Sequence, residues 1–133
     1  MRILRFSREL WEQMRANVMA KIPEEACGLL AGCDDQGEKV MPITNELHSP
    51  DRFRMAAQEL VEAFISMDGK GWELTAIYHS HPRGPAQPSA TDLKEFAYPG
   101  SLYLIWSPQD GEWSCRAFEM QEQESTEIPI SIL

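Results

Sequence analysis

The sequence predicts a domain of mixed α and β structure, and three observations lead to this class. The chain has 133 residues, of which 43% are hydrophobic, and this is enough apolar matter for one core. Apolar residues recur at helical spacing in two stretches, and short runs rich in β-branched and aromatic residues lie between and after them. No repeat, linker or low-complexity tract divides the chain. We therefore expect a single α/β domain over residues 1–133.

Two longer helices and one short helix are expected. Ser7 can cap the first, and Pro23 prevents its continuation, so we expect it from about Arg8 to Lys21. Its apolar positions are Leu10, Trp11, Met14 and Val18. The second is expected from Ala56 to Met67, before the turn-rich "DGKG". Its apolar positions are Leu60, Ala63, Phe64 and Met67. The short helix is expected in "SATDLKEFA", residues 89–97, which a capping serine opens.

Five segments are expected to form strands, because they are short apolar or alternating runs bounded by turn residues. They are residues 27–32, 39–47, 73–81, 101–106 and 113–120. The first two flank a turn at residues 34–37 and the last two flank "SPQDG", so each pair is expected to form a hairpin. The third ends before Pro82, which cannot donate a hydrogen bond to a sheet. The acidic residues 119–127 are expected to be a solvated edge or tail.

Charge and composition argue against several classes of partner. The formal net charge is −9 and the 12 Lys and Arg residues are scattered, whereas a nucleic-acid-binding surface needs clustered positive charge. No apolar run is long enough to cross a bilayer, and "MRILRFSREL" lacks the features of a signal peptide, so we expect a cytoplasmic protein without a membrane partner. Cys27, Cys33 and Cys115 include no CxxC pair, which favours reduced thiols over a disulfide framework.

Two of the three histidines lie one residue apart at the end of a predicted strand. Side chains alternate between the faces of a strand, so His79 and His81 point the same way and Ser80 points away. Two imidazoles on one face can act as a bidentate metal clamp. His48, the third histidine, lies between the second predicted strand and the second helix, and we expect a loop residue without a ligand role.

A third metal ligand is expected from the predicted short helix. Catalytic zinc sites take three protein ligands, commonly imidazoles and a carboxylate, and leave a fourth position for water. Asp92 completes such a set if the loop of residues 82–88 folds the helix back over the strand end, and Ser89 then lies beside the metal. The alternative is purely structural: Ser89 and Asp92 are spaced like a helix capping box, and the two histidines could be surface residues.

Hydrolysis at such a metal also requires a group that accepts a proton from water, and a carboxylate elsewhere in the chain can supply it. Glu24 and Glu25 are adjacent, and on composition alone either could be this base. Cys27 is an alternative nucleophile in principle, but its apolar surroundings disfavour the thiolate. A core role is therefore expected for Cys27.

The chain resembles the JAMM or MPN-plus zinc metalloproteases, also called the JAB1/MPN/Mov34 family. The signature of this family is a distant Glu, then HSHP, then Ser and Asp, and the chain carries "HSHP" at residues 79–82 and "SATD" at residues 89–92. The segment "PEEACGLLAG" is similar to the family's segment in which a catalytic Glu lies three residues before a Gly. The resemblance extends from the first helix to "SLYLIW" and assigns the catalytic role to Glu25 rather than Glu24.

The resemblance implies a fold, a reaction and a substrate. The implied fold is α/β, with a curved mixed β-sheet flanked by helices, similar to the cytidine deaminase-like fold. The implied reaction is hydrolysis of an amide bond with Zn²⁺ on His79, His81 and Asp92, with Glu25 accepting a proton and Ser89 donating a hydrogen bond to the oxyanion. Short standalone prokaryotic members are similar to enzymes that cut after the C-terminal Gly-Gly of ubiquitin-like sulfur carrier proteins.

Two alternative functions belong to other classes. A non-catalytic MPN module that binds protein partners would typically lack the metal residues, which this chain keeps. A nucleoside deaminase would carry HxE and PCxxC motifs, and the sequence contains neither. The zinc peptidase therefore remains the expected function.

Overall fold

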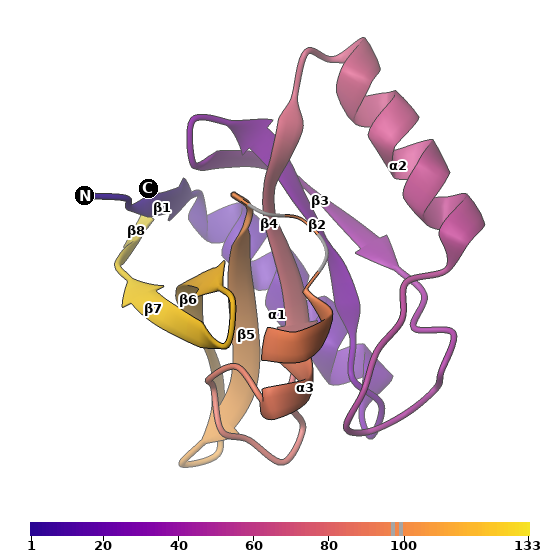
Figure 1. Cartoon of the computed structure of the whole chain (residues 1–133), viewed down its shortest axis with the longest axis vertical. Helices are drawn as coiled ribbons and strands as arrows, with labels where there is room; N and C mark the ends of the chain where they lie inside the picture. Colours follow the sequence, from indigo (N-terminus) through magenta and orange to yellow (C-terminus); the bar gives the residue numbers. More distant parts are fainter. Residues whose placement is uncertain (97, 99) are drawn as a thin grey trace.

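The computed structural model describes residues 1–96, 98 and 100–133. Within these residues the chain forms three helices and one mixed sheet of eight strands (Figure 1). The helices are α1 (Arg8–Lys21), α2 (Ala57–Gly69) and α3 (Ala90–Glu95). The strands are β1 (Leu4–Phe6), β2 (Cys27–Cys33), β3 (Gln36–Ile43), β4 (Glu73–Ser80), β5 (Leu102–Gln109), β6 (Glu112–Gln121), β7 (Glu124–Ile128) and β8 (Ile130–Ile132). Among the described helices, none combines the length and the hydropathy that a membrane span requires.

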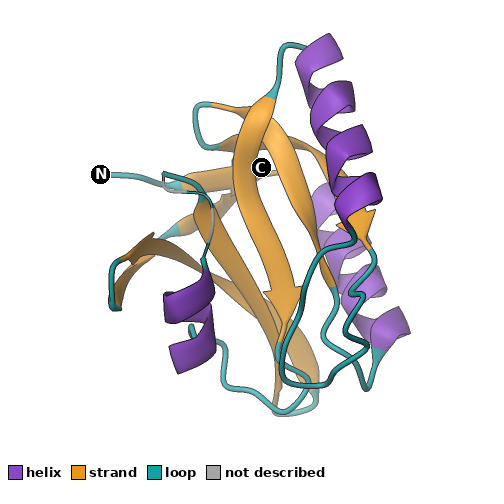
Figure 2. Cartoon of the chain, turned by 45° about the vertical axis from the view of Figure 1, so that its right-hand side comes forward, coloured by secondary structure: helices purple, strands orange, loops and turns teal. Residues whose placement is uncertain are grey.

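The sheet is curved (Figure 2), and its two outer strands are consecutive in the sequence. The strand order is β7-β6-β5-β4-β2-β3-β1-β8, and the parallel pairs are β4–β5, β1–β3 and β1–β8. Although β7 and β8 lie at opposite ends of this order, only Pro129 separates them in the chain. Leu4 in β1 donates a backbone hydrogen bond of 3.0 Å to the Pro129 carbonyl. Pro129 therefore links the two ends of the sheet.

Helices cover both faces of the sheet: α1 lies on one face, and α2 and α3 lie on the other (Figure 1). The buried apolar residues form two clusters that follow this division. Met14 of α1 belongs to the cluster that contains Tyr78 of β4, whereas Met67 of α2 belongs to the cluster that contains Ile77. Because side chains alternate along β4, His79 points to the same face as Ile77.

A close approach of β2 and β4 explains the glycine of "CGLLAG". Gly28 pairs with Tyr78, and a Cβ atom at position 28 would lie 2.3 Å from Tyr78 Cε2. The Tyr78 hydroxyl donates a hydrogen bond of 2.6 Å to Asn17 Oδ1 on α1, which holds the fully buried ring in place. A residue without a side chain is therefore required at position 28.

Arg2 connects parts of the sheet that are far apart in its strand order. Its guanidinium donates hydrogen bonds of 3.0 and 2.8 Å to the carboxylate of Asp35, in the turn between β2 and β3. It donates another of 2.8 Å to Glu119 in β6, and one of 3.0 Å to the Gly100 carbonyl. Hydrogen bonds from Arg2 outweigh the opposing effect of burial and lower the pKa of Asp35.

The structure confirms most of the predicted elements and corrects several of their ends. The first helix has the predicted bounds, and the second begins at Ala57, one residue later than predicted, and continues to Gly69. β4 ends at Ser80, so His81 directly follows it. The short helix ends at Glu95, whereas the last residue predicted for it, Ala97, lies outside the described residues.

The first hairpin is tighter than predicted, and this shifts β3. Only Asp34 and Asp35 lie between its strands, and both have positive φ angles, 52° and 62°, which suit a two-residue hairpin turn. β3 therefore begins at Gln36 and ends at Ile43, where residues 39–47 are predicted. In the second hairpin the turn is likewise reduced to Asp110 and Gly111.

The two ends of the chain hold more strand than the sequence analysis predicts. It does not include β1 or β8, because alternation is not recognisable over three residues. The acidic segment that is expected to be an edge or tail forms the end of β6 and all of β7, which is an outer strand. The edge interpretation is confirmed for this segment, and the tail interpretation is wrong.

Candidate active site

Four polar side chains meet at one end of the sheet. Glu25 lies in the segment before β2, His79 near the end of β4, His81 directly after β4, and Asp92 in the first turn of α3. All four are buried, with exposed fractions of 3%, 0%, 8% and 8%. The loop between β4 and α3 folds the helix back over the end of β4, as predicted, and this brings Asp92 to the two histidines.

His79, His81 and Asp92 form a triangle of potential ligand atoms. The two Nε2 atoms are 3.1 Å apart, and Asp92 Oδ2 lies 3.2 Å from His79 Nε2 and 3.1 Å from His81 Nε2. Ligands at the corners of a zinc tetrahedron, with bonds of about 2.0–2.1 Å, lie about 3.3 Å apart. The triangle therefore fits one face of tetrahedral coordination. Two imidazoles with one carboxylate are also a known donor set of catalytic zinc sites.

The two imidazole rings are held in place by different contacts. His81 Nδ1 lies 2.8 Å from the Pro85 carbonyl, which can only accept, so Nδ1 carries a proton and the neutral form of His81 has its lone pair on Nε2. His79 Nδ1 is buried and has no hydrogen-bond partner among the described residues. The ring of His79 stacks instead on Phe53, with ring centroids 4.6 Å apart, and meets Tyr103 edge-on at 6.0 Å. Burial lowers the pKa of His79, which favours the neutral imidazole that binds metals.

Ser89 and Asp92 form a complete capping box at the start of α3. Ser89 Oγ accepts a hydrogen bond of 3.0 Å from the Asp92 amide, and Asp92 Oδ2 accepts one of 2.9 Å from the Ser89 amide. The structural interpretation of this pair is thus confirmed. It does not exclude a ligand role, because the same Oδ2 faces both histidines. Burial opposes ionisation of Asp92, but hydrogen bonds from His79 and from the Ser89 amide outweigh it and hold the pKa of Asp92 well below its ordinary value.

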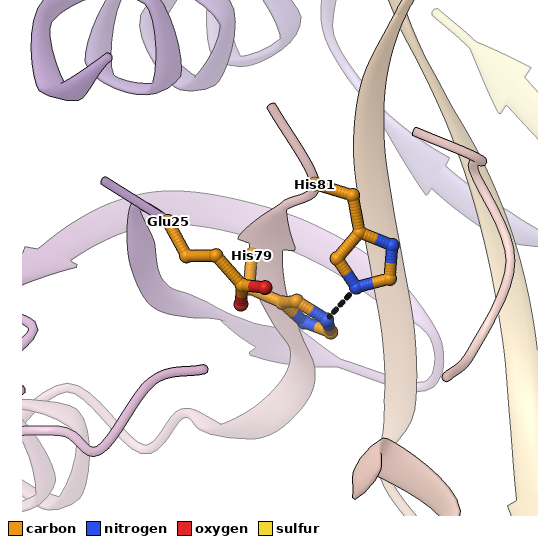
Figure 3. A group of neighbouring side chains, drawn as sticks. All are labelled: Glu25, His79 and His81. Atoms are coloured by element: carbon orange, nitrogen blue, oxygen red, sulfur yellow. Dashed lines mark hydrogen bonds between the residues drawn. The ribbon is translucent and has the colours of Figure 1, made fainter. Parts of the chain in front are cut away.

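The carboxylate of Glu25 points toward His79 and His81 (Figure 3). One oxygen of this carboxylate and one nitrogen of each histidine lie within 4.8 Å of one another. Burial raises the pKa of Glu25 to about 8, although the nearby His81 opposes the shift. Glu25 Oε1 is buried without a hydrogen-bond partner in the part of the chain that the structure describes. A carboxylate in this environment is suited to accept a proton.

Glu24 lies outside this cluster although it is adjacent to Glu25. Its carboxylate interacts with His48 Nδ1 at 3.1 Å, and the side chain of His48 is 65% exposed. The arrangement agrees with Glu25 as the candidate base and with His48 as a loop residue. Cys27 is buried and donates a hydrogen bond of 3.4 Å to the Ile43 carbonyl. Burial raises the pKa of Cys27 to about 12, so it is a core thiol rather than a nucleophile.

A groove of about 370 Å³ adjoins the cluster at Asp92. Its walls come from the loop between β3 and α2, from α2 itself, and from α3 and the residues after it. Phe53, Met55 and Ile77 contribute apolar surface, and Arg52 contributes a cationic side chain. A groove with apolar and charged walls, one of which includes the potential metal ligand Asp92, can receive part of a peptide substrate.

Sequence reasoning missed three residues that shape the site. Phe53 stacks on His79, Pro85 accepts a hydrogen bond from His81, and Asn45 donates one of 3.1 Å to the Glu25 carbonyl. Pro85 lies in the loop between the two motifs at residues 79–82 and 89–92, and this position in the sequence was the one signal that could have pointed to it. The loop that carries Asn45 and Phe53 has no spacing pattern that connects it with the histidines.

A metal clamp and a proton-accepting carboxylate are the two parts that a metal-dependent hydrolase requires, and the fold brings candidates for both together. Comparison with known proteins agrees with this class. The family described as prokaryotic homologs of the JAB domain matches residues 7–120, and the chain belongs to this family.

Several relatives are similar over nearly the whole chain. A protein of Thermus thermophilus named probable TtuB-protein conjugate cleaving protease is 40% identical over 129 residues, which cover 96% of this chain and 83% of the relative. The CysO-cysteine peptidase of Mycobacterium tuberculosis is 31% identical over 128 residues, 94% of this chain and 88% of the relative. The solution structure of DSY2949 from Desulfitobacterium hafniense has a TM-score of 0.88 and 33% identity, and the match covers 99% of this chain and 93% of that one.

The family, the fold class and the enzyme class expected from the sequence are confirmed by these findings. The curved mixed sheet flanked by helices is present, and the named relatives are peptidases. The chain is therefore a hydrolase of the JAMM type, and the non-catalytic binding module is not supported. The triangle of His79, His81 and Asp92, with Glu25 beside it, is a candidate metal site.

Proposed function

We propose that this chain is a zinc-dependent peptidase or isopeptidase that hydrolyses the amide bond after the C-terminal Gly-Gly of a ubiquitin-like sulfur carrier protein. The observation that carries the proposal is the triangle of His79, His81 and Asp92 beside the buried carboxylate of Glu25. The relatives support the substrate class, because one is named for cleaving TtuB-protein conjugates and another as a CysO-cysteine peptidase.

His79, His81 and Asp92 would hold the zinc ion through two Nε2 atoms and one Oδ2 atom. Zn²⁺ in such a site polarises the scissile carbonyl and lowers the pKa of water toward about 7. The neutral form of His79 and the anionic form of Asp92 are the protonation states that ligands require. The Pro85 carbonyl accepts a hydrogen bond from His81, and the Ser89 amide donates one to Asp92, so both side chains are held in place.

Glu25 accepts a proton from the attacking water and later delivers it to the leaving amine. An opposite charge nearby lowers the pKa of a carboxyl, so a cation in the site would bring Glu25 from a pKa of about 8 into its ionised form near neutral pH. The buried Oε1 atom has no hydrogen bond to give up among the described residues, and this leaves a lone pair for the proton.

Ser89 stabilises the oxyanion that forms when water attacks the carbonyl. Its Oγ accepts a hydrogen bond from the Asp92 amide, so the hydroxyl proton is left over for another acceptor. A donor aimed at the developing negative charge is a common way to lower the barrier of acyl transfer. In this proposal the capping and catalytic roles of Ser89 are compatible.

The placement of the site suits a narrow, flexible tail. β4 is an internal strand with β2 and β5 at its sides, so a substrate cannot pair with it, and the groove that Asp92 lines offers an alternative approach to the site. Residues without side chains pass most easily between buried ligands, which favours Gly-Gly beside the scissile bond. The net charge of −9 favours a carrier with a neutral or basic contact face.

We place the enzyme in the cytoplasm and treat residues 1–133 as one catalytic domain. Free cysteines at positions 27, 33 and 115 suit a reducing compartment. Both apolar clusters are built on the same sheet, which suits a single folding unit.

The test is mass spectrometry of carrier proteins that bear an extension after Gly-Gly, incubated with the wild type or with Glu25→Gln. The wild type should remove the extension, and Glu25→Gln should keep zinc but lose turnover about a hundredfold or more, because an amide cannot accept the proton. Treatment with a chelator should abolish cleavage, and added Zn²⁺ should restore it. Equal cleavage of Gly-Gly and bulky variants would refute the substrate class, and an active Glu25→Gln variant would refute the assigned base.

A further inference from the structure

The position of the Glu25 carboxylate depends on its backbone. Glu25 lies two residues before Cys27, the first residue of β2, so the pairing of β2 with its neighbours does not include it. Glu25 Oε1 also receives no hydrogen bond from any residue that the structure describes. Because a proton acceptor must be placed accurately relative to its substrate, other contacts have to fix this segment.

Three hydrogen bonds hold the amide and the carbonyl of Glu25 and the amide that follows them. The Glu25 amide donates to the Ser49 carbonyl at 2.8 Å, and the next amide, that of Ala26, donates to Ser80 Oγ at 2.8 Å. The Glu25 carbonyl accepts from Asn45 Nδ2 at 3.1 Å. Ser49 contacts Glu25 through its backbone, and Ser80 contacts Ala26 rather than Glu25. Of these three partners, Asn45 alone contacts Glu25 through a side chain, which a substitution can remove.

Asn45 uses its whole amide group, and it is 5% exposed. Nδ2 donates to the carbonyls of Glu25 and Arg52, at 3.1 and 3.0 Å. Oδ1 accepts from the amides of Leu47 and Arg54, both at 3.1 Å. Two donors and two acceptor sites are the full capacity of an asparagine side chain, so each atom has a defined role.

The partners of Asn45 divide into the proton acceptor and a loop. Arg52 and Arg54 flank Phe53, the residue that stacks on His79. Through Asn45, the loop that places Phe53 over a metal ligand is therefore tied to the backbone that carries Glu25. One buried side chain thus couples the backbone of Glu25 to the loop that carries Phe53.

We propose that Asn45 is a positioning residue for Glu25, and this inference rests on the proposed role of Glu25 as the proton acceptor. The two hydrogen atoms on Nδ2 hold the Glu25 carbonyl at a fixed place against the loop, and so aim the carboxylate at the water between the metal ligands and the substrate. Oδ1 contacts the loop alone, through the Leu47 and Arg54 amides. Nδ2 joins the loop to Glu25, because it donates to the carbonyls of both Arg52 and Glu25.

Asn45→Asp removes the link between the loop and Glu25, because it keeps the shape and the Oδ1 acceptor but replaces the donor by an oxygen that repels the carbonyls of Glu25 and Arg52. We expect kcat for the extended carrier to fall about tenfold to a hundredfold, since displacing a catalytic group by about 1 Å can cost that much. KM and zinc affinity, measured by competition with a chromophoric chelator, should change less than about threefold, because the substitution replaces no side chain that lines the groove and no candidate ligand.

Glu59→Ala is the matched control. Glu59 Oε1 accepts a hydrogen bond of 2.9 Å from the Thr44 amide, so this change loosens the start of the same loop without touching Glu25. Its melting temperature should fall, while its kcat stays within about twofold of the wild type. Should Asn45→Asp not fold, Asn45→Ser is the second variant, because its shorter side chain cannot reach the Glu25 carbonyl, and the same loss of kcat is expected.

The outcomes separate this inference from the proposed function. If Glu25→Gln is inactive and the Asn45 variant retains the kcat of the wild type, or loses no more than Glu59→Ala does, the positioning role is overturned. If Glu25→Gln is active, the proposed function fails and the inference fails with it. A loss of zinc affinity in parallel with kcat would also overturn it, because the effect would then pass through the metal ligands.

Discussion

Ser89 occupies a position where one side chain has a structural and a proposed catalytic task. Its Oγ caps α3, and its proton is available for an oxyanion. Ser89→Ala should lower the free energy of unfolding by about 1 kcal/mol through loss of the cap. It should also lower kcat by about tenfold to a thousandfold through loss of the donor. Urea titration and steady-state kinetics measure the two effects, and a variant that is less stable but fully active would show that Ser89 is a cap and nothing more.

The residues of the candidate metal site could be grouped from the sequence because each lies within a short motif with a simple geometric rule. His79 and His81 share a face because they are two residues apart on a strand, and Asp92 follows at the start of a helix. Asn45 and Phe53 follow no such rule. They reach the site because their loop crosses the end of β4, and a local pattern contains no information about that path.

At the scale of elements, the pairing of β2 with β4 places Glu25 beside the two histidines of the candidate site. Cys27 pairs with His79, so Glu25 precedes β2 at the level of the histidines. Gly28, one residue further on, allows the ring of Tyr78 to fit between β2 and α1. The glycine lies three residues after the glutamate in "EACG" because the position opposite Tyr78 has no room for a side chain.

Gly28→Ala should destabilise the protein by about 1–3 kcal/mol, because the added methyl group overlaps a ring that cannot move away. The matched control is Gly69→Ala, where no atom lies within 4 Å of the added Cβ and the stability should be unchanged or slightly higher. Urea titrations of both variants provide the comparison. Equal stability of the two would mean that the contact with Tyr78 relaxes at no cost.

The elements that could be predicted are those that are long and have recognisable residues at their start and end. α1 has a capping serine, an apolar stripe and a proline beyond its end, and its bounds agree with the prediction. β1 and β8 contain three residues each and form only by pairing with each other and with β3. Their formation is decided by tertiary contacts rather than by local preference.

At the scale of the whole molecule, Arg2 joins the turn between β2 and β3 to β6. Its side chain is 30% exposed and those of Asp35 and Glu119 are 26% and 34% exposed, so these ion pairs are partly protected from solvent. Because the network connects regions that are distant in the strand order, it stabilises the curvature of the sheet rather than a single hairpin.

Arg2→Ala should lower the free energy of unfolding by about 1–2 kcal/mol at pH 7, the range for hydrogen bonds to charged groups that are partly exposed. The pKa of Asp35 is lowered in the folded state, so its contribution is present above the ordinary Asp value of about 3.9 and is lost as the pH falls further. The difference between wild type and variant should therefore shrink toward about pH 2. Urea titrations across this range measure it.

Arg54→Ala is the control for this comparison, because Arg54 forms an ion pair with Glu46 in which the side chains are 68% and 42% exposed. Its effect should stay below about 1 kcal/mol and change little with pH. A pH-independent effect of Arg2→Ala would indicate lost packing of its aliphatic stem instead of lost charge pairing.

The order in which the chain can fold follows from the position of β8. Leu4 and Phe6 are fully buried in the final structure, and β8 covers the outer side of their strand through the pairs from Leu4–Ile130 to Phe6–Ile132. During synthesis on a ribosome, β1 emerges before β8, and all the other elements lie between them in the sequence. One edge of β1 therefore stays unpaired until residues 130–132 have emerged, and a pairing of such wide sequence separation is expected to form late and slowly.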